Sequence, residues 1–245
     1  MLRVFIGYDD RERIAYHVLS HSIQRRASIP ISITPLNRAT LTAVFDRPRG
    51  EYDSTDFSIS RFIVPYLCDY EGWALFLDCD MLCLGDVADI ALYATLMDKY
   101  GTAIRCVQHN YTPSSETKFL NQKQTSYTRK NWSSVMLMNN ALCRNLTPEY
   151  VNKAPGLALH KFEWIDDGKV MQMPKKWNVL VGEENQADIR EAQLLHFTNG
   201  GPWFKDYEHV PGADLWRSEL EDMMQSMIGH TGVNRMSIVP TRKVA

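Results

Sequence analysis

Residues 73–80 read Trp-Ala-Leu-Phe-Leu-Asp-Cys-Asp, an apolar run that leads directly into two aspartates. The run predicts a buried strand, and Asp78 and Asp80 lie where that strand ends. Residues i and i+2 of an extended chain point to the same face, so both carboxylates can face one cation. Hard oxygen ligands suit Mg²⁺ or Mn²⁺. A surface turn after a core strand explains an isolated Asp-x-Asp equally well, so the rest of the chain has to decide.

The composition is that of a globular protein. Of the 245 residues, 44% are hydrophobic and 23% charged, which suits one large domain or a domain with a smaller lobe. The net charge of −2 gives no electrostatic reason to expect nucleic acid or an anionic membrane as partner. We find no apolar run long enough to span a bilayer and no signal-peptide pattern. The five cysteines lack the spacing of a zinc site, so we expect buried thiols and a cytoplasmic location.

Hydrophobic patterning predicts alternating strands and helices. The expected strands cover residues 4–6, 31–36, 74–77, 102–107 and 134–138. The expected helices cover residues 14–27, 57–67, 90–97 and 215–228, with Pro65 kinking or ending the second. This alternation predicts an α/β domain with a mainly parallel, Rossmann-like central sheet. Ligands of such sheets bind beyond the carboxyl ends of the strands, so residues 7–9 and 78–80 are expected to share one site.

One long polar segment interrupts this pattern. Residues 109–130 are rich in Ser, Thr, Asn and Gln and carry four basic residues. A connection of this length inside a compact domain is usually functional or disordered. The sequence leaves two interpretations with equal weight: a loop that covers a substrate, or a solvated insertion.

A second group of candidates follows the apolar residues 192–195. His196 stands at the end of a predicted strand, where a neutral imidazole can complete a metal site with two carboxylates. Gly200 and Gly201 let backbone N–H groups approach phosphate oxygens closely. Taken alone, this stretch favours a core histidine before a Gly-Gly-Pro turn, but beside Asp78 and Asp80 the metal interpretation is preferred.

Arg61 is the third candidate element. It lies in the apolar-patterned residues 58–65, shortly before the strand that delivers the aspartates. A guanidinium group binds phosphate oxygens in two-point fashion. An arginine on the polar side of an amphipathic helix explains the same position equally well.

These motifs resemble, in chain order, those of glycosyltransferase family 8, whose members have the GT-A fold and use nucleotide sugars. The matching stretches are residues 5–9, 60–65, 76–81, 131–139, 174–178 and 196–197. The resemblance implies one glycosyltransferase domain over residues 1–245. Residues 1–108 would form the half that binds nucleotide and metal, and residues 109–214 the half that binds donor sugar and acceptor. Residues 215–245 would form a C-terminal helix and tail.

The resemblance also implies roles for particular residues. Mn²⁺ or Mg²⁺ would be held by Asp78, Asp80 and His196. The donor, most simply a UDP-sugar, would contact Gly7, Tyr8, Asp9, Arg61, Asp78, Asn131, Ser133, Gly200, Gly201 and Lys205. A hexose would pass to an acceptor hydroxyl with retention of anomeric configuration.

The chain departs from the family pattern at two places. The lysine that contacts phosphate before the family's Pro-Trp pair is missing, and Lys205, just after Trp203, is the candidate to replace it. The Asp-Gln-Asp stretch at the donor sugar is also absent, and residues 162–167 occupy the corresponding region. Asp166 or Asp167, with Arg61, is therefore the candidate catalytic group.

Two other function classes remain open. A metal-dependent nucleotidyltransferase would share the strand-end carboxylates, but it is expected to carry a Gly-rich loop with Arg or Lys near the N-terminus. Here Gly7 is followed by acidic residues. A nucleotide-sugar-binding protein without turnover would explain the missing lysine. Release of nucleoside diphosphate by the purified protein distinguishes these classes.

Overall fold

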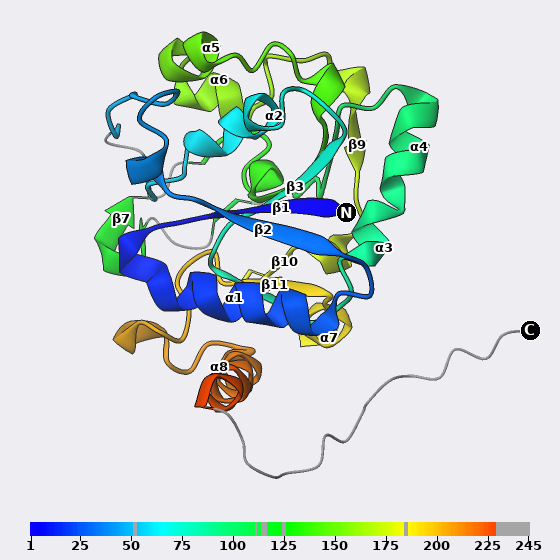
Figure 1. Cartoon of the computed structure of the whole chain (residues 1–245). Coiled ribbons are helices and arrows are strands. Elements are labelled where there is room, and N and C mark those ends of the chain that lie inside the picture. The colour runs from blue at the N-terminus through cyan, green and yellow to red at the C-terminus, as the bar shows by residue number, and fades with distance from the viewer. Residues whose placement is uncertain (51–52, 111, 114–116, 124–125, 184–185, 229–245) are drawn as a thin grey trace, which may run out of the picture.

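The computed structural model describes residues 1–50, 53–110, 112–113, 117–123, 126–183 and 186–228. The predicted tail beyond residue 228 and parts of the polar segment 109–130 lie outside these residues. Figure 1 shows strands at the centre of the molecule, with α1 (Arg13–Arg26) and α8 (Ala213–Ile228) on one side. Three short helices lie on the other side, namely α2 (Val64–Leu67), α5 (Pro148–Lys153) and α6 (Gly156–His160).

The central sheet has six strands in the order β2-β1-β3-β8-β5-β9. They are β1 (Leu2–Gly7), β2 (Ile31–Leu36), β3 (Trp73–Leu77), β5 (Ile104–Cys106), β8 (Val135–Asn139) and β9 (Val170–Gln172). Among the described residues, β8 alone runs against the other strands of this sheet. The predicted α/β class and the mainly parallel sheet are therefore confirmed.

The strand register brings the sequence motifs together. Ile6 of β1 pairs with Leu77 of β3, so the carboxyl ends of the two strands lie side by side, as expected. Leu77 also pairs with Val135 at the start of the antiparallel β8. The N–H of Asp78 then donates to the carbonyl of Ser134, 3.0 Å away. The start of β8 thus lies next to the first aspartate.

A second sheet delivers His196. Its order is β10-β11-β4, with β4 (Met81–Cys83), β10 (Val179–Leu180) and β11 (Leu194–His196). His196 pairs with Met81 in antiparallel fashion, and the N–H of Phe197 donates to the carbonyl of Asp80 at 2.8 Å. Because β4 begins directly after Asp80, this pairing sets the histidine beside the aspartate from more than a hundred residues away in sequence.

The remaining elements are short. The other α-helices are α3 (Ala88–Ala91), α4 (Tyr93–Tyr100) and α7 (Gln186–Glu191). Helices of the 3₁₀ type are η1 (Asp10–Glu12), η2 (Arg38–Thr40), η3 (Ser60–Ile63), η4 (Phe119–Asn121), η5 (Trp132–Ser134), η6 (Asn140–Leu142), η7 (Asp167–Lys169), η8 (Lys175–Trp177) and η9 (Lys205–Tyr207).

Two predicted helices differ from the structure. Residues 57–67 form a 3₁₀ turn followed by one turn of α-helix, and Pro65 lies in the first turn of α2 rather than at its end. A proline is tolerated there because its missing N–H has no partner in the first turn of a helix. The predicted helix 90–97 is divided at Leu92 into α3 and α4. Gly101, with φ of +60°, then ends α4 in the left-handed conformation.

The described part of the polar segment 109–130 is partly ordered by its own backbone pairing. Residues 111, 114–116 and 124–125 lie outside the described residues, but β6 (Thr117–Lys118) and β7 (Gln122–Lys123) form a small antiparallel hairpin. Phe119 is buried, and its ring stacks on Phe204 with centroids 5.0 Å apart. This stacking fastens the segment to the loop that follows His196.

All five cysteines are buried and unbridged, as predicted. Burial raises the pKa of each of these thiols, so they stay protonated near neutral pH. Within the described residues, no helix combines the length and apolar character needed to cross a membrane.

Candidate metal centre

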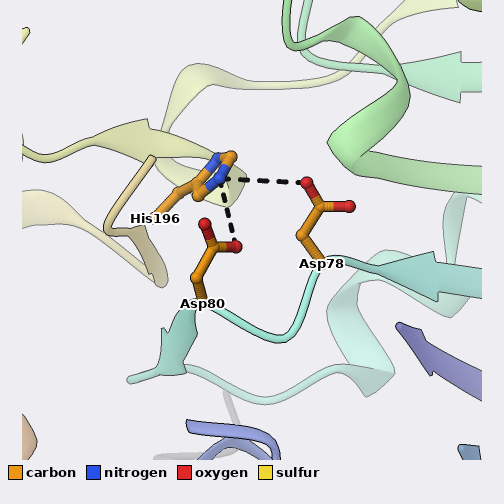
Figure 2. A group of neighbouring side chains, drawn as sticks. All are labelled: Asp78, Asp80 and His196. Carbon is orange, nitrogen blue, oxygen red and sulfur yellow. Dashed lines mark ion pairs between the residues drawn. The ribbon is translucent and has the colours of Figure 1, made fainter. Parts of the chain in front are cut away.

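The structure brings the three predicted metal ligands together. Asp78, Asp80 and His196 each offer one ligand atom, and these atoms lie within 4.8 Å of one another. Nε2 of His196 is 3.3 Å from Oδ1 of Asp80 and 4.0 Å from Oδ2 of Asp78. Figure 2 shows the imidazole facing both carboxylates, one at the end of β3 and the other just before β4.

Asn178 sets the orientation of His196. The amide nitrogen of Asn178 donates to Oγ of Ser134 at 2.8 Å and to the carbonyl of Asn131 at 3.3 Å. Its amide oxygen therefore faces Nδ1 of His196, 2.9 Å away. Because an amide oxygen only accepts, Nδ1 carries the proton. Nε2 then presents its lone pair to the two carboxylates.

This donor set fits a divalent cation. Two carboxylate oxygens and an imidazole lone pair that converge on one point repel one another unless a positive charge lies between them. His196 and Asp80 are almost completely buried, which strengthens that repulsion. Oxygen ligands suit Mg²⁺ and Mn²⁺, and the single imidazole suits Mn²⁺ in particular. Asp78, Asp80 and His196 would hold such an ion.

Arg61 is buried behind the first aspartate. Its Nη1 lies 2.7 Å from Oδ1 of Asp78 and donates to the carbonyl of Ser133 at 2.9 Å. Its guanidinium carbon lies 5.4 and 5.0 Å from the ring centroids of Phe57 and Phe76. Arg61 thus orients a carboxylate, a role that the sequence did not predict. Arg61 also lines the cleft.

A cleft of about 130 Å³ opens over the metal ligands. This enclosed volume is below the roughly 300 to 1,000 Å³ typical of small-molecule sites, so a large ligand would extend beyond it. The cleft is lined by Asp53, Ser54, Thr55, Ser58, Arg61, Asp78, Asp80, Tyr127, Lys130, Asn131, Ser133, Ser134, Gly156, Leu157, His160, His196 and Thr198. The predicted donor residues Arg61, Asp78, Asn131 and Ser133 are among them.

The predicted residues of the first strand lie beside the cleft rather than in its lining. Gly7 is needed for packing, because a Cβ at this position would lie 2.3 Å from the ring of Phe57. Tyr8 is half-buried and packs edge-on against Tyr16, with centroids 5.4 Å apart. Asp9 is buried and caps η1.

The carboxylate of Asp9 is already engaged by the protein. Arg11 binds both of its oxygens through the side chain, and the N–H of Asp56 donates to Oδ2 at 3.0 Å. Burial alone would raise the pKa of Asp9, but these hydrogen bonds outweigh burial and hold it below its usual value. Asp9 therefore ties the end of β1 to residues 54–56, of which Ser54 and Thr55 line the cleft.

The glycines after His196 are also explained by packing. A Cβ at Gly201 would lie 2.1 Å from the indole of Trp203, and one at Gly200 would lie 2.8 Å from the ring of Tyr207. Gly200 also has φ of +139°, which favours glycine. Lys205 is exposed in η9 and is not part of the cleft lining.

The two predicted catalytic carboxylates lie apart from the triad. Asp166 and Asp167 are exposed, and neither lines the cleft. Asp167 forms an ion pair with Arg129 at 2.6 Å. The structure therefore does not bring these two residues to the metal ligands.

Several cleft residues were missed by the sequence analysis. Tyr127, Gly156, Leu157, His160 and Thr198 have no motif that singles them out. Asn178 stood in a matching stretch but was given no role. His160 lies at the end of the short helix α6, and a lone histidine on such a helix gives no signal in a single sequence. Burial raises the pKa of the Tyr127 hydroxyl to about 12, opposed by Arg61 and assisted by Asp78.

No protein-family model matches the chain. It is 44% identical over 227 residues to Protein CDI of Arabidopsis thaliana, covering 90% of this chain and 86% of the plant protein. The chain belongs to the family of Protein CDI. That name states no activity, so this kinship by itself assigns none to the CDI-family chain.

Solved structures reveal the fold of this CDI-family chain. The bifunctional glycosyltransferase WbbM matches with a TM-score of 0.62 and 15% identity over 89% of the chain. The chain spans about half of WbbM, 49% of its length. The galactosyltransferase LgtC, solved with donor and acceptor sugar analogues, matches at 0.51 and 14% identity over 95% of the chain and 98% of LgtC. A glycosyltransferase involved in glycosylating the PBCV-1 major capsid matches at 0.53 and 11% identity over 91% and 99%. The chain therefore has the GT-A glycosyltransferase fold.

Proposed function

We propose that this protein is a metal-dependent glycosyltransferase of the family 8 type. It moves a hexose from a nucleoside diphosphate sugar, with UDP as the nucleotide, to an acceptor hydroxyl in the cytoplasm, with retention of configuration. The observation that carries the proposal is the convergence of Asp78, Asp80 and His196 on one cleft of a GT-A fold.

Each residue has a defined task in this proposal. Asp78, Asp80 and His196 would hold Mn²⁺ or Mg²⁺, and such an ion would supply Lewis-acid stabilisation of charge on the diphosphate. Arg61 keeps Asp78 in place through Nη1 and offers Nη2 to the phosphate as negative charge develops. Asn131 and Ser133 face the donor from the start of β8, and residues 7–9 lie on the nucleoside side.

Segment 109–130 is proposed as a cover for the donor. Tyr127 and Lys130 line the cleft, so this segment already contributes to the site. Exclusion of water by the segment would favour attack by the acceptor hydroxyl over hydrolysis. Gly200, Gly201 and Lys205 would then face the phosphates from the opposite loop, and Lys205 would have to move to reach them.

A donor panel with a product-release assay tests the function. The purified protein is incubated with UDP-glucose, UDP-galactose, UDP-xylose and GDP-mannose, with Mn²⁺ or with excess EDTA. Release of nucleoside diphosphate from at least one donor, dependent on the metal, is the expected result. A separate assay supplies a nucleoside triphosphate and a sugar phosphate. Release of pyrophosphate in that assay would instead indicate a nucleotidyltransferase. Binding without release from any donor would indicate a binding protein.

A further inference from the structure

One wall of the cleft carries the imidazole of His160, at the end of α6, and the hydroxyl of Ser133, in η5. Nδ1 of His160 lies 2.8 Å from Oγ of Ser133, and both residues line the cleft. Among the described residues that line it, the carboxylates are Asp53, Asp78 and Asp80. The last two are the metal ligands, and Asp53 accepts a hydrogen bond from the backbone of Gly50 in a separate loop.

The His160–Ser133 pair is connected to the metal ligands by a short series of contacts. The carbonyl of Ser133 accepts from Nη1 of Arg61, and the same nitrogen contacts Asp78. One residue therefore touches His160 with its side chain and Arg61 with its backbone. This connection places the imidazole on the same wall of the cleft as the metal ligand Asp78.

Packing holds the imidazole ring in one orientation. The ring of His160 packs edge-on against the buried Phe62, with centroids 5.3 Å apart and an interplanar angle of 77°. The ring of Tyr127 is a second aromatic neighbour, tilted by 48° with centroids 6.1 Å apart. A ring fixed between two aromatic groups and a hydroxyl presents its polar atoms in a defined direction.

The direction of a bound donor follows from its chemistry, and this step rests on the proposed function. A metal-bound diphosphate has the nucleoside on one side and the sugar on the other. We place the nucleoside at residues 7–9, which the carboxylate of Asp9 joins to the loop at Asp56. The sugar then extends toward Ser133, His160 and Tyr127.

We propose that His160, oriented by the hydroxyl of Ser133, binds a hydroxyl group of the transferred sugar and helps to select that sugar. Apart from Asp53 and the two candidate metal ligands, the described residues of the lining include no carboxylate, so the sugar would meet the imidazole of His160 and the hydroxyl of Ser133 here. Asp166 and Asp167, which the sequence favoured for a position at the sugar, are exposed and outside the cleft lining.

The test compares binding of a nucleotide with and without its sugar. Calorimetry with Mn²⁺ measures the Kd of UDP and GDP and of four nucleotide sugars, UDP-glucose, UDP-galactose, UDP-xylose and GDP-mannose. For His160→Ala, the Kd of the sugar-free nucleotide is expected to stay within twofold of wild type. The Kd of the preferred nucleotide sugar is expected to rise about tenfold, the size of one lost hydrogen bond to a neutral group.

Two further variants separate sugar contact from structural damage. Ser133→Ala removes the hydroxyl but keeps the carbonyl that binds Arg61. It is expected to weaken binding of the nucleotide sugar but not of the nucleotide, by a smaller factor than His160→Ala. His160→Asn can keep the bond to Ser133 with its amide, yet it shortens the side chain, so at least a fivefold loss of sugar affinity is expected. His209→Ala, at an exposed histidine outside the cleft lining, is the control and is expected to bind like wild type.

The outcomes distinguish the two proposals. If wild type binds none of the nucleotides or nucleotide sugars, the proposed function fails and the inference on His160 fails with it. If wild type binds a nucleotide sugar more tightly than its nucleotide but His160→Ala and His160→Asn preserve that difference, only the inference is overturned. Equal losses for nucleotide and nucleotide sugar in these variants also overturn it, because they indicate general damage to the cleft.

Discussion

Asn178 accepts a hydrogen bond from Nδ1 of His196 at 2.9 Å, and this one contact determines which nitrogen of the histidine faces the two aspartates. The amide is itself fixed by Ser134 and by the carbonyl of Asn131. The start of β8, the loop after η8 and the end of β11 thus act together on one imidazole. A residue beyond the ligands themselves therefore controls the proposed metal site.

The first prediction concerns this contact. Asn178→Ala is expected to weaken Mn²⁺ binding by roughly 10- to 100-fold, because His196 loses the group that fixes its tautomer and orientation. Calorimetric titration with Mn²⁺ measures the change. Asn139→Ala is the control, since Asn139 is similarly buried but bonds to Asp98. A metal affinity that falls equally in both variants would contradict the assigned role of Asn178.

The second prediction concerns Arg61. Arg61→Lys keeps the positive charge but cannot bond Ser58, Ser133 and Asp78 at the same time, as the guanidinium does. Turnover is expected to fall at least tenfold. The free energy of unfolding is expected to fall by about 1–3 kcal/mol, because buried acceptors lose their donor. Urea denaturation and the product-release assay measure both quantities. A variant within twofold of wild type in turnover would remove Arg61 from the proposed machinery.

The third prediction concerns acid stability. Burial lowers the pKa of His109 to about 3, with His196 and Lys175 adding to the shift. An unfolded histidine titrates near 6.5, so below that pH the unfolded state binds a proton that the folded state does not. As the pH falls from roughly 6 to 3, His109 is therefore expected to lower the free energy of unfolding by about 1.4 kcal/mol for each pH unit.

Urea denaturation at several pH values measures this slope. His109→Gln removes the titrating group, and its stability is expected to fall less steeply over the same range, whatever its stability at pH 7. The carboxyl of Asp9, whose pKa is held below its usual value, begins to lose its contribution only below about pH 4, and it does so in both proteins. Parallel curves for wild type and His109→Gln would show that this histidine does not titrate as described.

The fourth prediction concerns Gly201. A methyl group at this position would lie 2.1 Å from the indole of Trp203, which packs on Trp216 of α8 at 5.3 Å. Gly201→Ala is therefore expected to destabilise the protein by about 1–3 kcal/mol through overpacking. Gly168→Ala is the control, because a Cβ there meets no atom within 4 Å. Thermal unfolding measures both, and equal midpoints would show that the Trp203 loop adapts freely.

The sequence revealed most of the fold because its signals are local. The apolar runs that became β1, β2 and β3 end in polar residues, and this pattern requires no knowledge of the tertiary structure. The sequence also pointed to the three residues of the candidate metal centre, because Asp78 and Asp80 are separated by one residue and His196 follows an apolar strand. The division of the helix at Leu92 escaped it, since the apolar pattern continues across the break.

The sequence could not predict that His160 and Tyr127 line the cleft, and the reason is physical. His160 and Tyr127 are brought to the site by a short helix and by a segment with little periodicity, so only tertiary packing gives them a role. Asp166 and Asp167 were favoured by their position relative to the family pattern, but both are exposed to solvent at the start of η7. Glycines 7, 200 and 201 were predicted to face a ligand, and the structure gives each of them a second reason, because a Cβ there would meet an aromatic ring.

The metal centre is tested most directly by anomalous scattering from crystals of the protein grown with Mn²⁺ and UDP. We expect one strong anomalous peak between the carboxylates of Asp78 and Asp80 and Nε2 of His196, with the diphosphate of UDP on the same ion. Crystals of Asp80→Ala, which is expected to fold normally, should lack this peak. An ion and a nucleotide bound elsewhere in wild-type crystals, with the triad empty, would contradict the central claim.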